Sequence, residues 1–423
     1  MKIRTSRIIL ISPVGFAMIA YAFFWACTMV PPSVYQGIMH ENNYMFMHLP
    51  SHLLVGGCVV AFIFGATVLR ARASGPADHL DNRRTMGASF IALPILGLSM
   101  INIISIALLL ENNPNLLTGW ISDGRSAKMD LDATGAMTNA LPALYATCWW
   151  GLWRIMDREH ITGTRQLTLR AILVIATFIS IYSALVKVAR YDLLPCVFGL
   201  AVVYLSHKYS TGKLKLSGSF TSFAAIALIV VGLFLAMAWL RGSDEVAILG
   251  RNVAGYTAAS YNRLAAILDG AMKLPYSDTG VHAFKFLTYI PIANRWIDFP
   301  ALFGMPTKED AWLSEFGAVA QSGLDGSYIW SSAFGYVYSD IGIFSIVYFL
   351  IIGMLSQRAW KSAISGRSFG LFTYPWIAFS ILFWMGDNFI AHSKIIVFIG
   401  MGIVFTIYDR LTLRRENVLR MMK

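Results

Sequence analysis

The chain has 423 residues, of which 57% are hydrophobic and only 13% are charged, and its formal net charge is +11. Because a soluble protein of this composition would expose many apolar helices to water, we exclude a soluble fold and expect an all-α, polytopic membrane protein. The cysteines fall inside apolar runs at no metal-ligand spacing. We therefore expect them to be small buried side chains, with no disulfide framework (Cys27, Cys58, Cys148 and Cys196).

Repeated apolar runs, each close to the roughly 20 residues that cross a bilayer, predict ten spanning helices in one integral membrane domain, residues 1–423. The first run follows Lys2 and Arg4 as in a signal sequence, but it is long enough to span. No small-x-small cleavage site is convincing, so we expect an uncleaved first helix. The predicted spans are residues 8–30, 53–69, 87–110, 135–153, 171–186, 191–205, 219–240, 331–355, 371–390 and 395–408.

The Lys and Arg residues are concentrated in alternate connections between the predicted spans. The N-terminal tail, residues 70–84, 154–170, 207–216 and 357–367, and the C-terminal tail hold 22 of the 34 cations and only 6 acidic residues. By the positive-inside rule these segments face the cytoplasm, which places both termini inside and the long loop at residues 241–330 outside. The net charge therefore follows from topology, and nucleic-acid binding has no separate support.

Residues 241–330 form the only long hydrophilic interruption, with 7 Lys or Arg and 9 Asp or Glu. Within this loop, residues 245–273 are rich in Ala and Leu and end before Pro275, which predicts one helix. Three later prolines predict irregular, turn-rich structure (Pro291, Pro300 and Pro306). The loop is also rich in aromatic rings, which beside charged groups suit sugar faces and phosphates, and equally a loop that rests on a bilayer.

The predicted outward turn at residues 187–192 brings two cations to the outer edge of the hydrocarbon. Cations held there cost free energy unless they face a cavity, an acid or an anion. Lys187 and Arg190 could therefore bind a diphosphate; the alternatives are a local pair with Asp192 or snorkelling to the headgroups.

Asp340 lies nine residues into its predicted span, beside Tyr338. An acid at that depth could act as a base in a partly wet cavity, or it could bond a neighbouring helix, and we favour the structural role. Several charged residues on the outward half of the spans predict one polar chamber that faces outside (Lys187, Arg190, Asp192, Asp340, Asp387 and Lys394).

Four arginines in and beside the loop supply guanidinium groups, which match phosphate oxygens better than ammonium groups do (Arg241, Arg251, Arg263 and Arg295). For any one of them alone, an ordinary salt bridge is the alternative. A phosphate contact is therefore expected of the set rather than of any specified arginine. No phosphate-binding loop of the Walker type is present, so we do not expect ATP-driven transport by this chain.

This layout resembles the O-antigen polymerase (Wzy-type) family, which has many spans, inside termini and a dominant external loop in its second half. Val188-Ala-Arg190 before an apolar span resembles the family's arginine at the head of a central helix. Tyr338-Ser-Asp-Ile-Gly342 resembles its aromatic–acid–small pattern at the start of a late span. The repeated Arg-x10-Gly pattern of some members does not begin at Arg241, Arg251 or Arg263.

The resemblance implies a GT-C-like fold and glycosyl transfer without metal or cofactor, on the periplasmic face of the bacterial inner membrane. A glycan would leave undecaprenyl diphosphate and join a second lipid-linked repeat unit. Implied partners are this lipid-linked oligosaccharide and membrane lipid, with a chain-length regulator and a flippase left open. A ligase of finished glycan and a carrier of lipid-linked oligosaccharide remain alternatives. The predicted catalytic residues are Arg190, Arg251, Arg263 and Asp340, and the predicted substrate-binding residues are Lys187, Arg241, Tyr256, Tyr261, His282, Arg295 and Tyr338.

Overall fold

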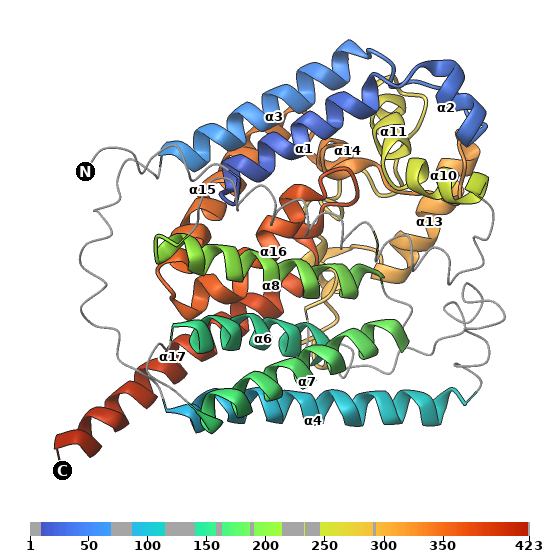
Figure 1. Ribbon diagram of the computed structural model, residues 1–423. Coiled ribbons are helices and arrows are strands. Elements are labelled where there is room, and N and C mark those ends of the chain that lie inside the picture. Colours follow the sequence, from blue (N-terminus) through green and yellow to red (C-terminus); the bar gives the residue numbers. More distant parts are fainter. Residues whose placement is uncertain are drawn as a thin grey trace. The chain divides into compact units, whose positions relative to one another are not determined.

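The computed structural model describes residues 10–68, 87–114, 140–157, 163–186, 190–213, 232, 246–290 and 293–421. Within these ranges every element of secondary structure is a helix (Figure 1). Of the described helices, 6 are long and apolar enough to cross a membrane, or 7 if the bent pair α1 (Pro13–Thr28) and α2 (Pro32–Met39) forms one span. The predicted class, an all-helical polytopic membrane protein, is confirmed, and the exact number of spans stays a prediction.

The candidate spans coincide with the predicted ones at six places. They are α3 (Leu49–Val68), α4 (Ala88–Asn112), α7 (Thr164–Val186), Asp192–Ser210 of α8 (Arg190–Ser210), Ser332–Ile364, and Lys394–Thr412 of α17 (Lys394–Met421). Ser332–Ile364 comprises α14 (Ser332–Ile341), η6 (Gly342–Phe344) and α15 (Ser345–Ile364). The predicted spans at 135–153 and 371–390 correspond to shorter helices, α6 (Ala140–Met156) and α16 (Ser368–Leu382). Apart from Gly232, the predicted span at 219–240 lies outside the described residues.

The remaining helices lie in the loop, apart from one short helix that follows α16. They are α10 (Val246–Gly255), α11 (Ala258–Leu268), η4 (Lys285–Leu287), η5 (Ala293–Arg295), α12 (Phe299–Phe303), α13 (Lys308–Gln321) and η7 (Phe389–Ala391). The chain divides into two compact units, one with residues 1–72, 243–357 and 377–396 and the other with residues 73–242, 358–376 and 397–423. The single domain over residues 1–423 stays a prediction.

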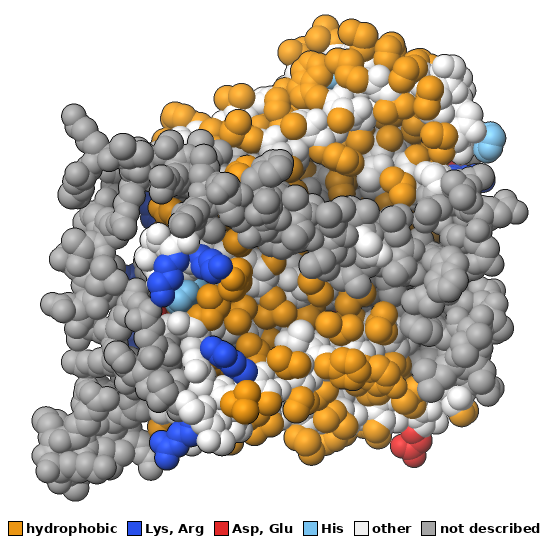
Figure 2. Space-filling model, viewed as in Figure 1, with side chains coloured by type: hydrophobic (Ala, Val, Ile, Leu, Met, Phe, Trp, Pro, Cys, Tyr) orange, Lys and Arg blue, Asp and Glu red, His pale blue; other side chains and the backbone are white. Residues whose placement is uncertain are grey.

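The second unit is built on four helices: α6 packs against α4, α7 and α8, and α7 also packs against α4 and α8. The indole N–H of Trp149 in α6 donates to the carbonyl of Cys196 in α8 at 3.1 Å. The same indole ring packs directly against Gly199 of α8. Short connections join α6 to α7 and α7 to α8, so the end of α8 lies beside the start of α7. Cations follow this arrangement in the sequence, with Arg165 and Arg170 near the start of α7 and Lys208 and Lys213 near the end of α8. On the face shown in Figure 2, several Lys and Arg side chains lie toward the left, and hydrophobic side chains cover much of the described surface.

In the first unit, α1, α3, α11 and α14 pack together, and α10 packs against α2. Helices α3 and α15 approach at two glycines. A Cβ atom at Gly65 would lie 2.2 Å from the carbonyl oxygen of Leu350, and one at Gly353 would lie 2.1 Å from that of Phe62. Small residues at such contacts let helix backbones approach closely, which is how helices associate inside a bilayer.

The prediction of one helix over residues 245–273 is wrong, because the chain breaks between α10 and α11. Gly255 at the end of α10 lies against the ring of Tyr328, where a Cβ would come within 2.3 Å, and Thr257 has φ −127° and ψ −88°. A close approach to a ring that is distant in sequence therefore sets the break. The break also changes the expected positions of Arg251 and Arg263, which would have been about 18 Å apart on one straight helix.

Candidate functional site

Arg263 lies in the interior of the first unit and is fully buried. Its Nη1 and Nη2 atoms each donate to one carboxylate oxygen of Glu41, both at 3.1 Å. The same two nitrogens donate to the carbonyls of Ala259 and Asp325, each at 2.8 Å. Tyr35 also donates its hydroxyl to Glu41. Both terminal nitrogens of Arg263 are thus bonded within the protein, and the residue ties the connection after α2 to the loop.

Arg251 approaches the same turn from the other side of the break. Its Nη2 lies 2.7 Å from Oδ2 of Asp325, and its side chain is 42% exposed. Burial raises the pKa of Asp325, but hydrogen bonds from Ser327 and Arg251 outweigh this, so its pKa lies below the ordinary value. Arg251 therefore combines a fixed position with access to solvent, which Arg263 lacks.

A second group of ionisable side chains surrounds Asp387, in the connection after α16. Nζ of Lys285 lies 2.7 and 2.8 Å from the two carboxylate oxygens of Asp387, and Nε2 of His392 lies 2.8 Å from Oδ2. Lys285 also lies over the ring of Tyr336, with Nζ 4.1 Å from the ring centroid. One carboxylate thus holds a lysine and a histidine in fixed positions.

Glu315 of α13 and His282 extend this group. The hydroxyl of Tyr336 donates to Oε2 of Glu315 at 2.8 Å, and Nδ1 of His282 lies 3.8 Å from Oε1. Burial raises the pKa of Glu315 to about 7, and burial together with Lys285 lowers the pKa of His282 to about 4. Burial opposes the charge of Lys285, but Asp387 and Glu315 outweigh it and raise its pKa. Strongly shifted groups that share partners are typical of functional sites.

Asp340 supports the turn that carries His282 and Lys285. Its Oδ2 accepts hydrogen bonds from the backbone N–H groups of His282 and Ala283, each at 2.7 Å. The amide of Asn388 donates to the carbonyl of His282 at 3.2 Å. These contacts agree with the structural role favoured for Asp340, and they place Lys285 beside Asp387.

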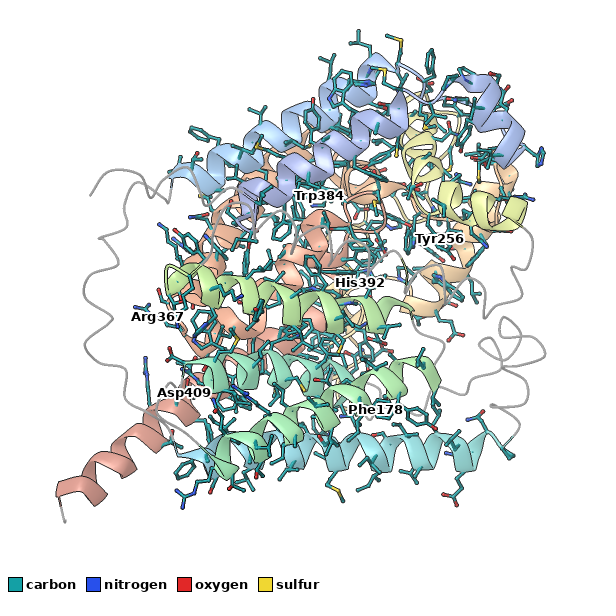
Figure 3. The ribbon with its side chains drawn as sticks, in the orientation of Figure 1. Phe178, Tyr256, Arg367, Trp384, His392 and Asp409 are labelled. Atoms are coloured by element: carbon teal, nitrogen blue, oxygen red, sulfur yellow. The ribbon has the colours of Figure 1, made fainter. Side chains whose placement is uncertain are left out.

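A row of aromatic rings connects the two groups. Tyr256 lies at the break between α10 and α11, and its ring centroid is 4.9 Å from that of Trp330. The ring centroid of Trp330 is 5.8 Å from that of Phe389. Phe389 in turn lies 5.4 Å from the ring of His392. Tyr256 and His392 are labelled in Figure 3, and all four rings belong to the first unit.

The structure brings several of the predicted site residues together. Arg251 and Arg263 meet at Asp325 with Tyr256 nearby, and Asp340 and His282 lie beside the Lys285 group. Tyr261 is buried against Phe24, and Tyr338 is partly buried on α14. Outside the described residues lie Lys187 and Arg241, together with the side chains of Arg190 and Arg295.

Sequence reasoning missed Lys285, Glu315 and His392. Lys285 stands between Phe284 and Phe286, and a cation flanked by two aromatic residues in a polar loop is a local signal of burial. Glu315 is the acid on the inner face of α13 and carries no comparable signal.

In the described part of the chain, no group of three or more His, Cys, Asp or Glu side chains could hold a metal ion. Comparisons of the chain with family models, with curated proteins and with solved structures find no match.

Proposed function

We propose that the protein is a glycosyltransferase of the bacterial inner membrane that joins undecaprenyl-diphosphate-linked repeat units into surface polysaccharide on the periplasmic face. The polytopic helical architecture supports this proposal, because a polyprenyl-linked substrate is confined to the bilayer. It is also supported by the loop, whose described residues 246–290 and 293–330 carry buried ionisable groups next to candidate spans.

The observation that carries the proposal is the arrangement of His392, Asp387 and Lys285. A carboxylate on one ring nitrogen of a histidine fixes its tautomer, so that the other nitrogen can accept a proton. In the proposed reaction, Nδ1 of His392 accepts the proton of the acceptor hydroxyl while that oxygen bonds to the anomeric carbon. The bond from the anomeric carbon to the diphosphate oxygen breaks, and the diphosphate leaves with the electron pair.

The leaving diphosphate needs positive charge that it can reach. Lys285 lies next to the base, and Arg251 is the described loop arginine whose guanidinium combines exposure with a fixed position. Guanidinium and ammonium groups fixed before the reaction stabilise charge that develops in the transition state. We therefore assign diphosphate contact to Arg251 and Lys285 in place of the buried Arg263. The diphosphate contact predicted for Arg190, whose side chain lies outside the described residues, stays a prediction.

The aromatic row supports an oligosaccharide substrate. Rings of Tyr256 and Trp330 present flat apolar surface that suits sugar faces, and they lead toward His392. Both residues are partly buried and partly exposed.

The test is deletion of the gene in the bacterium that carries it, followed by complementation. Wild-type protein should restore long surface glycan, whereas His392→Asn should leave single repeat units on the surface. His40→Asn, on an exposed histidine in the left-handed conformation that asparagine tolerates, is the control and should restore long glycan. Long glycan from His392→Asn would remove His392 from the mechanism.

A carrier of lipid-linked oligosaccharide is the second candidate, because buried ionisable groups within membrane proteins also serve proton-coupled transport. The deletion strain separates the candidates. Single repeat units at the surface support a polymerase, and absence of any repeat unit outside supports a carrier. Long polymer that stays on undecaprenyl diphosphate supports a ligase.

A further inference from the structure

Helix α2 leaves α1 at an angle of 90° after a short break (Figure 1). Pro31 and Pro32 explain the turn, because proline cannot continue the hydrogen bonding of α1 but fits the first position of a new helix. Since α1 has the apolar composition of a span, a helix at a right angle to it would lie along the membrane plane when α1 crosses the bilayer.

The faces of α2 differ sharply in polarity. At about 100° per residue, Val34 and Ile38 lie within about 40° of each other, and they are 50% and 38% exposed. The adjoining quarter of the helix carries Tyr35 and Met39, which are buried. The opposite half is exposed and carries no large apolar side chain (Ser33, Gln36, Gly37 and His40).

The buried quarter fixes the rotation of α2. The hydroxyl of Tyr35 donates a hydrogen bond to Glu41, and Glu41 also accepts a hydrogen bond from Arg263. Helix α2 in addition packs against α10. Val34 and Ile38 therefore cannot turn into the protein without breaking this buried network. Their exposure is a property of the folded unit.

Exposed apolar side chains also lie on the segment that leads from α2 to the candidate span α3. Met47 is 61% exposed, and its backbone N–H donates to the carbonyl of Thr28 at the end of α1, 3.3 Å away. Leu49 and Leu53 then expose their side chains at the start of α3, a candidate span. Exposed apolar side chains thus occur on α2, at Met47 beside the end of α1, and at the start of α3.

We propose that α2 is an interfacial helix whose Val34 and Ile38 insert between the lipid headgroups and acyl chains beside α1 and α3. The occupant of this face is the bilayer itself. The helix has no Lys, Arg, Asp or Glu, so its insertion depends on apolar contact and not on anionic lipid. Because Glu41 follows α2 and holds Arg263, the helix also fixes the loop at the level of the headgroups.

The experiment uses the full chain in phospholipid nanodiscs, with a nitroxide label on Val34→Cys or Ile38→Cys. Gln36→Cys, on the polar half of the same helix, is the matched control, and the unsubstituted protein measures labelling of the buried native cysteines. Labels at positions 34 and 38 should collide more often with oxygen than with a water-soluble nickel complex, and the label at position 36 should do the reverse.

Two outcomes overturn the proposal. Equal collision patterns at positions 34, 36 and 38 would mean that both faces of the helix lie in the same medium, in water if nickel collisions dominate. Low collision rates with both reagents at positions 34 and 38 would mean that another protein or a second copy covers this face. Neither result depends on glycan synthesis.

Discussion

Arg263 and Glu41 are 222 positions apart in the chain and form a fully buried, two-pronged ion pair. Glu41 also accepts a hydrogen bond from the backbone N–H of Asp325 at 2.6 Å. Three segments, the end of α2, α11 and the turn at residue 325, therefore meet at one carboxylate. A buried pair of this kind contributes little when intact, but removal of one partner leaves an uncompensated charge.

Arg263→Ala should therefore destabilise the protein by about 3–5 kcal/mol. Its melting temperature in detergent should fall well below that of wild type. Arg251→Ala is the matched control, because its half-exposed pair with Asp325 should contribute only about 0–1 kcal/mol. A stable Arg263→Ala protein that no longer makes long glycan would restore the role first predicted for Arg263.

Arg251→Ala should instead reduce glycan polymerisation while the protein stays folded. The reason is the loss of an accessible guanidinium that would contact the leaving diphosphate. Chain length of the surface glycan and yield of folded protein are the two measurements. Lys273→Ala, at an exposed loop lysine, provides the control for loss of one loop cation. Long glycan from Arg251→Ala would exclude this residue from diphosphate contact.

Gly353→Ala should weaken the contact between α3 and α15. The new Cβ would lie 2.1 Å from the carbonyl oxygen of Phe62, which is backbone and cannot move aside alone. Overpacking of this kind costs about 1–3 kcal/mol. Gly97→Ala, in α4 with no atom within 4 Å of its Cβ, should leave the melting temperature unchanged or raise it. Equal melting temperatures of the two variants would mean that α3 and α15 do not touch at Gly353.

The stability of the protein should depend on pH through Glu315. Burial raises its pKa from 4.5 to about 7, so the folded protein keeps a proton that the unfolded chain loses in this range. The contribution of Glu315 to the free energy of unfolding is therefore greatest below pH 4.5 and decreases as the pH rises to about 7. His282, with its pKa lowered from 6.5 to about 4, acts in the opposite direction.

Glu315→Gln isolates the effect, because glutamine cannot ionise but can still accept the hydrogen bond from Tyr336. The melting temperature of Glu315→Gln relative to wild type should rise between pH 4.5 and pH 7 and then level off. Taking the difference between the two proteins cancels the contributions of groups that do not contact Glu315. A difference that stays constant over this range would mean that Glu315 ionises alike in both states.

His392→Asn should lower the rate of glycan transfer by about 10²–10⁴-fold, the usual contribution of a general base. The measurement is polymerisation of purified lipid-linked repeat units by the protein in nanodiscs. Lys285→Met should also lower the rate, and because it leaves Asp387 without its cation it should lower the melting temperature as well. His392→Asn should melt like wild type. A parallel loss of stability in both variants would assign His392 a structural role.

The sequence by itself determined the class of the protein and the places of most described spans. The span predicted at residues 53–69 corresponds to α3 (Leu49–Val68), and the span predicted at residues 87–110 corresponds to α4 (Ala88–Asn112). This succeeds because a backbone in hydrocarbon must satisfy its own hydrogen bonds, so each apolar run of sufficient length forms a helix whatever its neighbours are. Asp340 and Asp387 could be singled out for the same reason, since acids beside apolar runs need partners.

Only the tertiary structure decided which residues meet. Lys285 and Asp387 are 102 positions apart, and nothing local in either segment identifies the other. The break between α10 and α11 likewise depends on Tyr328, a ring that folding brings against Gly255. Ion pairs and ring contacts depend on distances in space, which local composition does not encode, so the buried role of Arg263 and the group around Asp387 appeared only in the fold.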